Sequence, residues 1–258
     1  MTTYFLNILQ GLLVTLGVSL GALVVAALLG LAGAAAKLSH HKWLNWVGDI
    51  YSTVIRGVPD LVWMLLLYFG GQILVNDIAE ALGFRRGPQI NPFVAGVLTI
   101  GFVYGAYMTE TFRGAIMSVP KGQSEAGWAF GMSRFYTFRR MVLPQMVRFA
   151  LPSFTNNWLV LLKATALVSV IGLADITNLA KQAGAAARGQ IPGAAIIFMA
   201  FAGLLYLLIS SVSLLLLRRA ELVALIRIQP GCQLIRRTMR LPDSGQLLIS
   251  LRYPRLRH

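Results

Sequence analysis

Five long apolar runs limit what this chain can fold into more than any other feature of its sequence. They cover residues 12–36, 58–75, 93–109, 159–176 and 194–217. A helix needs roughly 20 such residues to cross the hydrocarbon of a bilayer. The runs contain glycine, leucine, valine and alanine without the alternation of a strand, and a helix satisfies its own backbone hydrogen bonds where water is absent. The sequence therefore predicts an all-α membrane protein with about five transmembrane helices.

Charge predicts how these helices are oriented. If the N-terminus lies outside, 18 of the 23 lysines and arginines fall in cytoplasmic segments and 4 in external loops. Cytoplasmic loops of membrane proteins carry an excess of positive charge, so we expect a periplasmic N-terminus and a cytoplasmic C-terminus. The remaining cation, Lys163, lies in the fourth run, where a lysine snorkels to the interface or faces protein.

The same distribution accounts for the net charge of +14. Much of this charge follows from the topology, and seven arginines lie in a tail at residues 221–258 that has no apolar run of spanning length. We therefore expect no nucleic-acid partner. The chain divides into a membrane domain at residues 1–220 and a basic cytoplasmic tail of unknown role, which is either disordered or lies on the membrane surface.

Few residues offer metal or redox chemistry. Cys232 is the only cysteine, so no internal disulfide forms, and no Cys/His cluster has the spacing of a metal site. His40 and His41 stand beside Lys42 and two tryptophans, a composition typical of the membrane interface, where we expect contact with lipid. Residues 1–10 lack the basic start of a signal peptide, which predicts an uncleaved first helix.

Polar side chains in or beside the apolar runs are candidates for a substrate pathway. An acidic residue at membrane depth is a functional candidate by default, although capping a helix or pairing with a cation explains it equally well. Arg56 either caps its loop, pairs with an acidic residue in the next helical turn, or gates a path. Glu110 and Arg113 share a helix face, which favours an ion pair. The candidate pathway residues are Asp60, Glu110, Asn156, Asn157 and Asp175.

The segment at residues 125–144, EAGWAFGMSRFYTFRRMVLP, is a polar, basic and aromatic island between apolar runs. Ser124 is a suitable N-cap for a short helix beginning at Glu125, and Gly131 is suited to end or bend that helix. Its apolar members share one face, at Ala126, Ala129 and Phe130. On spacing alone, the island also fits an amphipathic helix that lies on anionic lipid.

The spacing within this island resembles the EAA loop of ABC-importer permease subunits. The family pattern is Glu-Ala-Ala, three residues, Gly, nine residues and Ile-x-Leu-Pro; here Gly127 replaces the second alanine and Met141 replaces the isoleucine. Further stretches resemble the polar and basic amino-acid branch, which includes the histidine and lysine/arginine/ornithine importers. They are LLVTLGVSLGALVVAALLG at 12–30, IRGVPDLVWMLLLYFG at 55–70, GFVYGAYMTETFRGAIMSVPKG at 101–122 and NNWLVLLKATALVSVIGLAD at 156–175.

The resemblance implies a non-catalytic transport subunit in the bacterial inner membrane that works by alternating access. Its implied cargo is histidine, arginine, lysine or ornithine. Its implied partners are a homologous second permease subunit, two ATP-binding subunits that bind ATP and Mg, and a periplasmic amino-acid-binding protein; the chain itself needs no cofactor. The residues implied to couple the ATPase to the membrane helices are Glu125, Ala126, Gly127, Gly131, Leu143 and Pro144.

The main alternative is an ion-coupled secondary amino-acid carrier or a channel subunit. Such a carrier predicts acidic coupling residues in mid-span, and often inverted repeats, and we find neither in the sequence. A membrane-embedded enzyme would need a nucleophile beside a base or a metal cluster. An ATPase would need a G-x-x-x-x-G-K-[ST] loop, which the sequence does not contain.

Overall fold

The computed structural model describes residues 2–85 and 87–227, and each regular element in that part of the chain is a helix. In chain order these are α1 (Thr2–Lys37), α2 (Lys42–Gly57), α3 (Asp60–Leu65), η1 (Leu66–Gly70), α4 (Gly71–Ala81), α5 (Pro92–Met117), α6 (Lys121–Ala129), α7 (Arg134–Thr137), η2 (Phe138–Val142), α8 (Leu143–Ala164), η3 (Thr165–Ile171), α9 (Ile176–Ala186) and α10 (Ala194–Arg227). Within the described residues, the chain up to Leu217 forms one compact unit. Most of the predicted tail lies outside the described residues.

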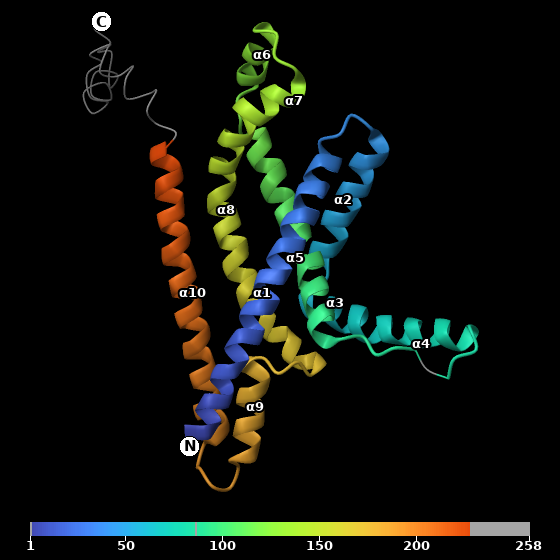
Figure 1. Cartoon of the computed structure of the whole chain (residues 1–258), viewed down its shortest axis with the longest axis vertical. Coiled ribbons are helices and arrows are strands. Elements are labelled where there is room, and N and C mark those ends of the chain that lie inside the picture. Colours follow the sequence, from blue (N-terminus) through green and yellow to red (C-terminus); the bar gives the residue numbers. More distant parts are fainter. Residues whose placement is uncertain (1, 86, 228–258) are drawn as a thin grey trace, which may run out of the picture. The chain divides into compact units, whose positions relative to one another are not determined.

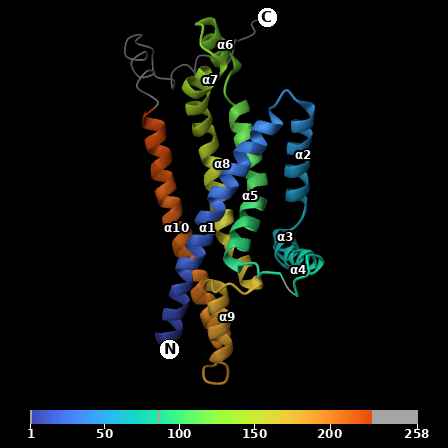
Figure 2. The ribbon, with the colours of Figure 1, turned by 45° about the vertical axis from the view of Figure 1, so that its right-hand side comes forward.

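Within Met1–Leu217, α1, α5 and α8 lie side by side along the length of the unit, and α2 runs back beside α1 and α5 (Figures 1 and 2). The first part of α10 packs on the start of α1, where the ring of Phe198 lies 5.6 Å from Tyr4 and 5.3 Å from Phe5. The α6–α7 hairpin stands at one end of the unit and α9 at the other (Figure 1). The fold therefore separates these two segments by the length of the bundle.

Five described segments are long and apolar enough to cross a membrane, as the sequence predicts. They are Thr3–Lys37, Asp60–Ala81, Pro92–Met117, Arg134–Ile171 and Ala194–Arg219. The fourth begins far earlier than the predicted residue 159, because neither proline in it ends the helix. Pro144 lies just after the π-helical segment η2, and Pro152 lies inside α8. As a result α7, η2 and α8 form one continuous helical run.

The apolar runs do not predict α2, which precedes the second span. This helix is amphipathic and buries only Gly48, Ser52 and Ile55, so it has no run of spanning hydropathy. The Tyr51 hydroxyl donates a hydrogen bond of 2.7 Å to the backbone oxygen of Phe102 in α5. The second half of α2 is thereby held beside the middle of α5.

Glycines allow α1 and α5 to pack closely. A Cβ atom at Gly101 of α5 would lie 2.6 Å from the Cβ of Val25 and 3.1 Å from the backbone oxygen of Ala22. A Cβ at Gly114, further along the same helix, would have no neighbour within 4 Å. Small residues at a helix interface let backbones approach in a membrane, where van der Waals packing drives association. The α1 seam therefore requires glycine at Gly101, whereas nothing in the described chain requires it at Gly114.

Candidate functional site

The polar island forms a helical hairpin, α6–α7, at one end of the unit. α6 begins at Lys121, with Pro120 at its N-cap position and no side-chain cap. The predicted start at Glu125 with a Ser124 cap is therefore wrong; the fixed φ of proline already favours a helix start four residues earlier. Gly131, with φ of +76°, makes the left-handed turn that follows α6. Its position after the helix confirms the predicted end.

Most of the predicted coupling residues lie on the surface of this hairpin or at the start of α8. The exposed ones are Glu125, Ala126, Gly131, Leu143 and Pro144, whereas Gly127 is buried. The predicted apolar face of α6, at Ala126, Ala129 and Phe130, is not covered by the described residues. Phe130 is 87% exposed, and the nearby Trp128, outside the predicted face, is 49% exposed. Exposed apolar clusters of this kind mark interaction surfaces.

Gly127 packs against the second half of the hairpin. A Cβ at Gly127 would lie 2.7 Å from Thr137 Cγ2 and 3.0 Å from Met141 Sδ. Gly127→Ala gains about 1 kcal/mol of helix propensity, but overpacking costs roughly 1–3 kcal/mol, so we expect a lower melting temperature. Thr137→Ala should restore it in the double variant, because it removes the obstructing atoms and a buried hydroxyl that has no hydrogen-bond partner within the described chain. Equal melting temperatures for the single and double variants would contradict this packing.

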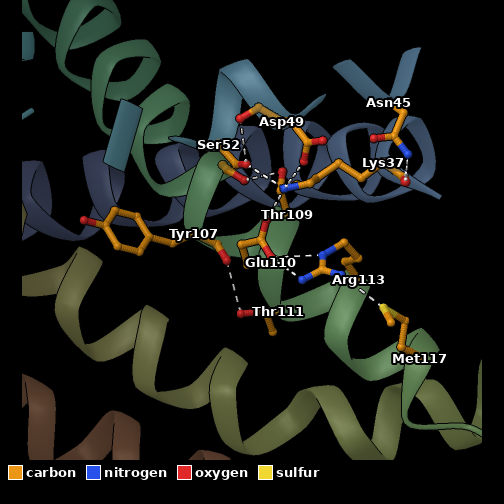
Figure 3. Close-up of polar contacts among 11 residues, drawn as sticks. Lys37, Asn45, Asp49, Ser52, Tyr107, Thr109, Glu110, Thr111, Arg113 and Met117 are labelled. Atoms are coloured by element: carbon orange, nitrogen blue, oxygen red, sulfur yellow. Dashed lines mark hydrogen bonds and ion pairs between the residues drawn. The ribbon is translucent and has the colours of Figure 1, made fainter. Parts of the chain in front are cut away.

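Lys37, in the last turn of α1, ties three helices together (Figure 3). Its ammonium lies 2.5 Å from Glu110 Oε1 of α5 and 2.8 Å from Asp49 Oδ1 of α2. The other carboxylate oxygen of Glu110 accepts a hydrogen bond of 3.0 Å from Arg113 Nε. The predicted Glu110–Arg113 pair is thus confirmed, and the carboxylate of Glu110 has a second cation as well. This ion network holds the α6–α7 ends of α1, α2 and α5 in a fixed relation.

Removing the central carboxylate should weaken the fold strongly. Glu110→Gln leaves the cations of Lys37 and Arg113 without their shared partner, and breaking a buried pair costs roughly 3 kcal/mol. Asp49→Asn is the matched control, because Asp49 is 54% exposed and exposed pairs contribute about 0–1 kcal/mol. Thermal unfolding in detergent should show a much larger loss for Glu110→Gln. Equal losses would mean that the network is too hydrated to stabilise the bundle.

Three of the five predicted pathway residues, Glu110, Asn156 and Asn157, line one pocket. It has a volume of about 410 Å³ and lies between the last turn of α2, α5 and α8. This is within the usual range of ligand pockets, about 300–1,000 Å³. The other lining residues are Arg56, Tyr107, Thr111, Pro152 and Ser153. Two segments of spanning length, which include α5 and α8, therefore carry this polar pocket.

The contacts inside this pocket fix some of its polar groups and leave others open. Asn157 Nδ2 donates a hydrogen bond of 2.9 Å to Thr111 Oγ1. The guanidinium carbon of Arg56 lies 5.1 Å from the centre of the Tyr107 ring, a cation–π contact. Tyr107 points away from the ion network around Glu110 (Figure 3), so the ring and the network form two different walls.

Asp60 lies close to the pocket but does not line it. Its Oδ2 accepts a hydrogen bond of 3.0 Å from the Tyr104 hydroxyl, and the Tyr104 ring stacks on Tyr107 with centres 5.5 Å apart. Asp60 has no ion pair with Arg56 within the described residues. Its role in a pathway stays a prediction.

Asp175 is fully buried and serves as the N-cap of α9. Its two carboxylate oxygens accept hydrogen bonds from the backbone N–H groups of Asn178, at 2.9 Å, and Thr177, at 3.1 Å. Burial raises the pKa of Asp175, and the hydrogen bonds from these amides act in the opposite direction. Helix capping accounts for these two contacts, and the Tyr206 hydroxyl of α10 donates a longer hydrogen bond of 3.5 Å to Oδ2. The role of Asp175 in a pathway also stays a prediction.

The structure adds two groups that sequence reasoning did not assign to a site. They are Lys37, which the sequence indicates only as one of the positive charges that orient the helices, and Tyr107, to which the sequence gives no role in a site. Lys37 and Glu110 are 73 residues apart, so no local spacing could pair them. The i,i+3 relation of Tyr104 and Tyr107 was a usable signal, because it places two phenol rings on one helix face.

Five segments of spanning length, two of which carry a polar pocket, define a multi-pass membrane protein. The chain matches, over residues 26–221, the family described as the binding-protein-dependent transport system inner membrane component. It belongs to this family, and its relatives are permease subunits of ABC importers.

Two similar proteins and one solved structure illustrate this relationship. The chain is 48% identical to the histidine/lysine/arginine/ornithine transport system permease protein HisQ of Salmonella typhimurium, with 85% of this chain and 95% of HisQ covered. It is 37% identical to the octopine transport system permease protein OccQ of Rhizobium radiobacter, with 87% and 93% covered. The crystal structure of an amino acid ABC transporter with histidines matches with a TM-score of 0.67 and 33% identity, covering 85% of this chain and 96% of that one.

Proposed function

We propose that this chain is a permease subunit that imports a basic or polar amino acid across the bacterial inner membrane by ATP-driven alternating access. Its similarity to HisQ, at 48% identity over most of both chains, supports histidine, arginine, lysine or ornithine as the cargo. The observation that carries the proposal is the uncovered α6–α7 hairpin, joined by one helical run to a polar pocket at membrane depth.

The proposed complex contains a homologous second permease subunit, two ATP-binding subunits and a periplasmic amino-acid-binding protein. ATP and Mg belong to the ATP-binding subunits, and this chain is non-catalytic. The α6–α7 end would be cytoplasmic and the α9 end periplasmic. Positive charge supports this orientation, since the hairpin and the helical run after it carry Lys121, Arg134, Arg139, Arg140 and Arg148.

In the proposed mechanism the hairpin is the coupling element. Glu125, Ala126 and Gly131, together with Leu143 and Pro144 behind them, would contact the ATP-binding subunit, while buried Gly127 lets the two halves of the hairpin pack closely. ATP binding closes the ATPase dimer and displaces α6. Because α7, η2 and α8 are continuous, that displacement would reach the pocket directly. ATP and the loaded binding protein would supply the difference in affinity between states that any ligand-driven change requires.

The proposed pathway passes the pocket lined by Glu110, Asn156 and Asn157. A cationic amino acid that leaves water needs carboxylate and carbonyl oxygens to replace its hydration. Amide and hydroxyl groups from α8 would supply further hydrogen bonds. Because Glu110 already contacts Lys37 and Arg113, we expect it to shape the electrostatic field of the pocket more than to bind cargo alone.

The test is uptake by the complete complex in proteoliposomes, with ATP inside and the binding protein outside. We expect accumulation of histidine, arginine, lysine or ornithine, and none of leucine or glutamate. Exclusive uptake of an acidic or apolar amino acid would overturn the proposed substrate class. Replacing Glu125 or Gly131 should lower the amount of ATP-binding subunit that co-purifies with the chain. Unchanged assembly and coupling would count against the hairpin's role.

A further inference from the structure

The Arg56 guanidinium is an exposed cation that lines this pocket. The described ion pairs of this region join Lys37 to Asp49 and Glu110, and Arg113 to Glu110, and none includes Arg56. Its described contact is with the neutral ring of Tyr107. Within a pocket of about 410 Å³, the guanidinium is therefore accessible to a negative group that enters during function.

The electrostatics of the pocket favour an anionic group over a cationic one. The charged residues that line it are Arg56 and Glu110, and Glu110 is paired with Lys37 and Arg113, so Arg56 is the charge on these walls that no described ion pair includes. Both oxygens of Glu110 are already in contact with cations. A second cation from a substrate side chain would meet no free carboxylate on these walls.

We infer that Arg56 binds the α-carboxylate of the amino acid as it passes through this pocket. This inference rests on the proposed function. Arginine presents a planar fork that holds a carboxylate through two parallel hydrogen bonds, and the Tyr107 ring beneath it restrains the plane of that fork. Ser153 and Asn156 are exposed within the same lining and supply neighbouring hydrogen-bond donors.

With this role, Arg56 recognises the α-carboxylate, which all amino-acid substrates have. The carboxylate is common to histidine, lysine, arginine and ornithine, whereas their side chains differ in length and shape. A site that holds the shared group passes such a set without discriminating among its members. Selection of the side chain then lies elsewhere in the complex.

The test measures binding to the complete transporter complex in nanodiscs, without the binding protein, whose own recognition would obscure the result. The probes are arginine and agmatine, which is arginine lacking the α-carboxylate. Losing hydrogen bonds to a charged group should make agmatine bind about 10- to 100-fold more weakly than arginine. Arg56→Gln should weaken the binding of arginine by a similar factor and leave the binding of agmatine unchanged. The difference in affinity between the two probes should therefore disappear. Arg56→Lys should restore part of it.

Lys42→Gln is the control, because Lys42 is an exposed cation at the other end of α2 and does not line the pocket. It should leave both affinities unchanged. The inference is overturned if Arg56→Gln keeps the preference for arginine or weakens both probes equally. It is also overturned if the variant fails to assemble with the second permease, since Arg56 would then pair with that partner. The same holds if the effect of the variant vanishes in nanodiscs without anionic lipid, since Arg56 would then pair with a lipid phosphate. Failure of the wild-type complex to transport would instead reject the proposed function.

Discussion

Replacing Trp128 and Phe130 together with aspartate is expected to abolish both co-purification of the ATP-binding subunits and substrate uptake. These rings lie on the uncovered surface of the hairpin. Large aromatic side chains dominate the energetics of protein interfaces, at about 2 kcal/mol or more each. Two such losses correspond to roughly a thousandfold weaker association, and the buried charge of the aspartates adds to this.

The matched control is Phe84→Asp, because Phe84 is 65% exposed and lies outside the hairpin, in the connection that follows α4. It should leave assembly with the ATP-binding subunits intact. Thermal unfolding of the purified chain should be nearly the same for the hairpin variant and the wild type, since the altered side chains contribute little to the core. If the double variant still assembles and transports, the hairpin is not the coupling element and its lipid-surface alternative gains support.

Gly101→Leu should disrupt the bundle, whereas Gly114→Leu on the same helix should be tolerated. The new side chain at Gly101 would meet the Cβ of Val25 and the backbone of Ala22, which cannot move without separating α1 from α5. We expect a loss near the upper end of the roughly 1–3 kcal/mol typical of overpacking, or more. At Gly114 there is open space, and replacing glycine in a helix gains about 0.5 kcal/mol or more.

Expression level and thermal unfolding in detergent measure this difference. Each substitution adds the same side chain to the same helix, so the comparison isolates the α1 seam. Similar behaviour of the two variants would mean that α1 and α5 pack less closely than the structure shows, or that the Gly114 face is covered by a partner subunit. Co-expression of the second permease separates these two outcomes.

The sequence predicts the spans well because a long apolar run in a membrane has few other structures available. It does not predict α2, because an amphipathic helix that buries only Gly48, Ser52 and Ile55 has too little apolar surface to form such a run. The apolar runs do not predict α9 either, where the Asp175 cap begins a helix. Composition detects burial in lipid and misses helices that are stabilised by packing and capping.

The candidate site is predictable in part for the same reason. Local spacing indicated a short helix in the polar island, its end at Gly131 and the Glu110–Arg113 pair, since each depends on residues close in sequence. The Lys37–Glu110 contact depends on three helices meeting, and only the tertiary structure shows it. The pocket likewise joins α2, α5 and α8, so the isolation of Arg56 from carboxylates emerges only once those helices are placed.

The most direct measurement of the proposed function compares two energy sources in one preparation of proteoliposomes. The complete complex is reconstituted, with the binding protein and labelled arginine outside. One sample contains ATP inside, and another contains no ATP but has an inward proton or sodium gradient. We predict accumulation only with ATP, and none with a nonhydrolysable analogue. Accumulation driven by the ion gradient without ATP would contradict the assignment and identify the chain as part of a secondary carrier.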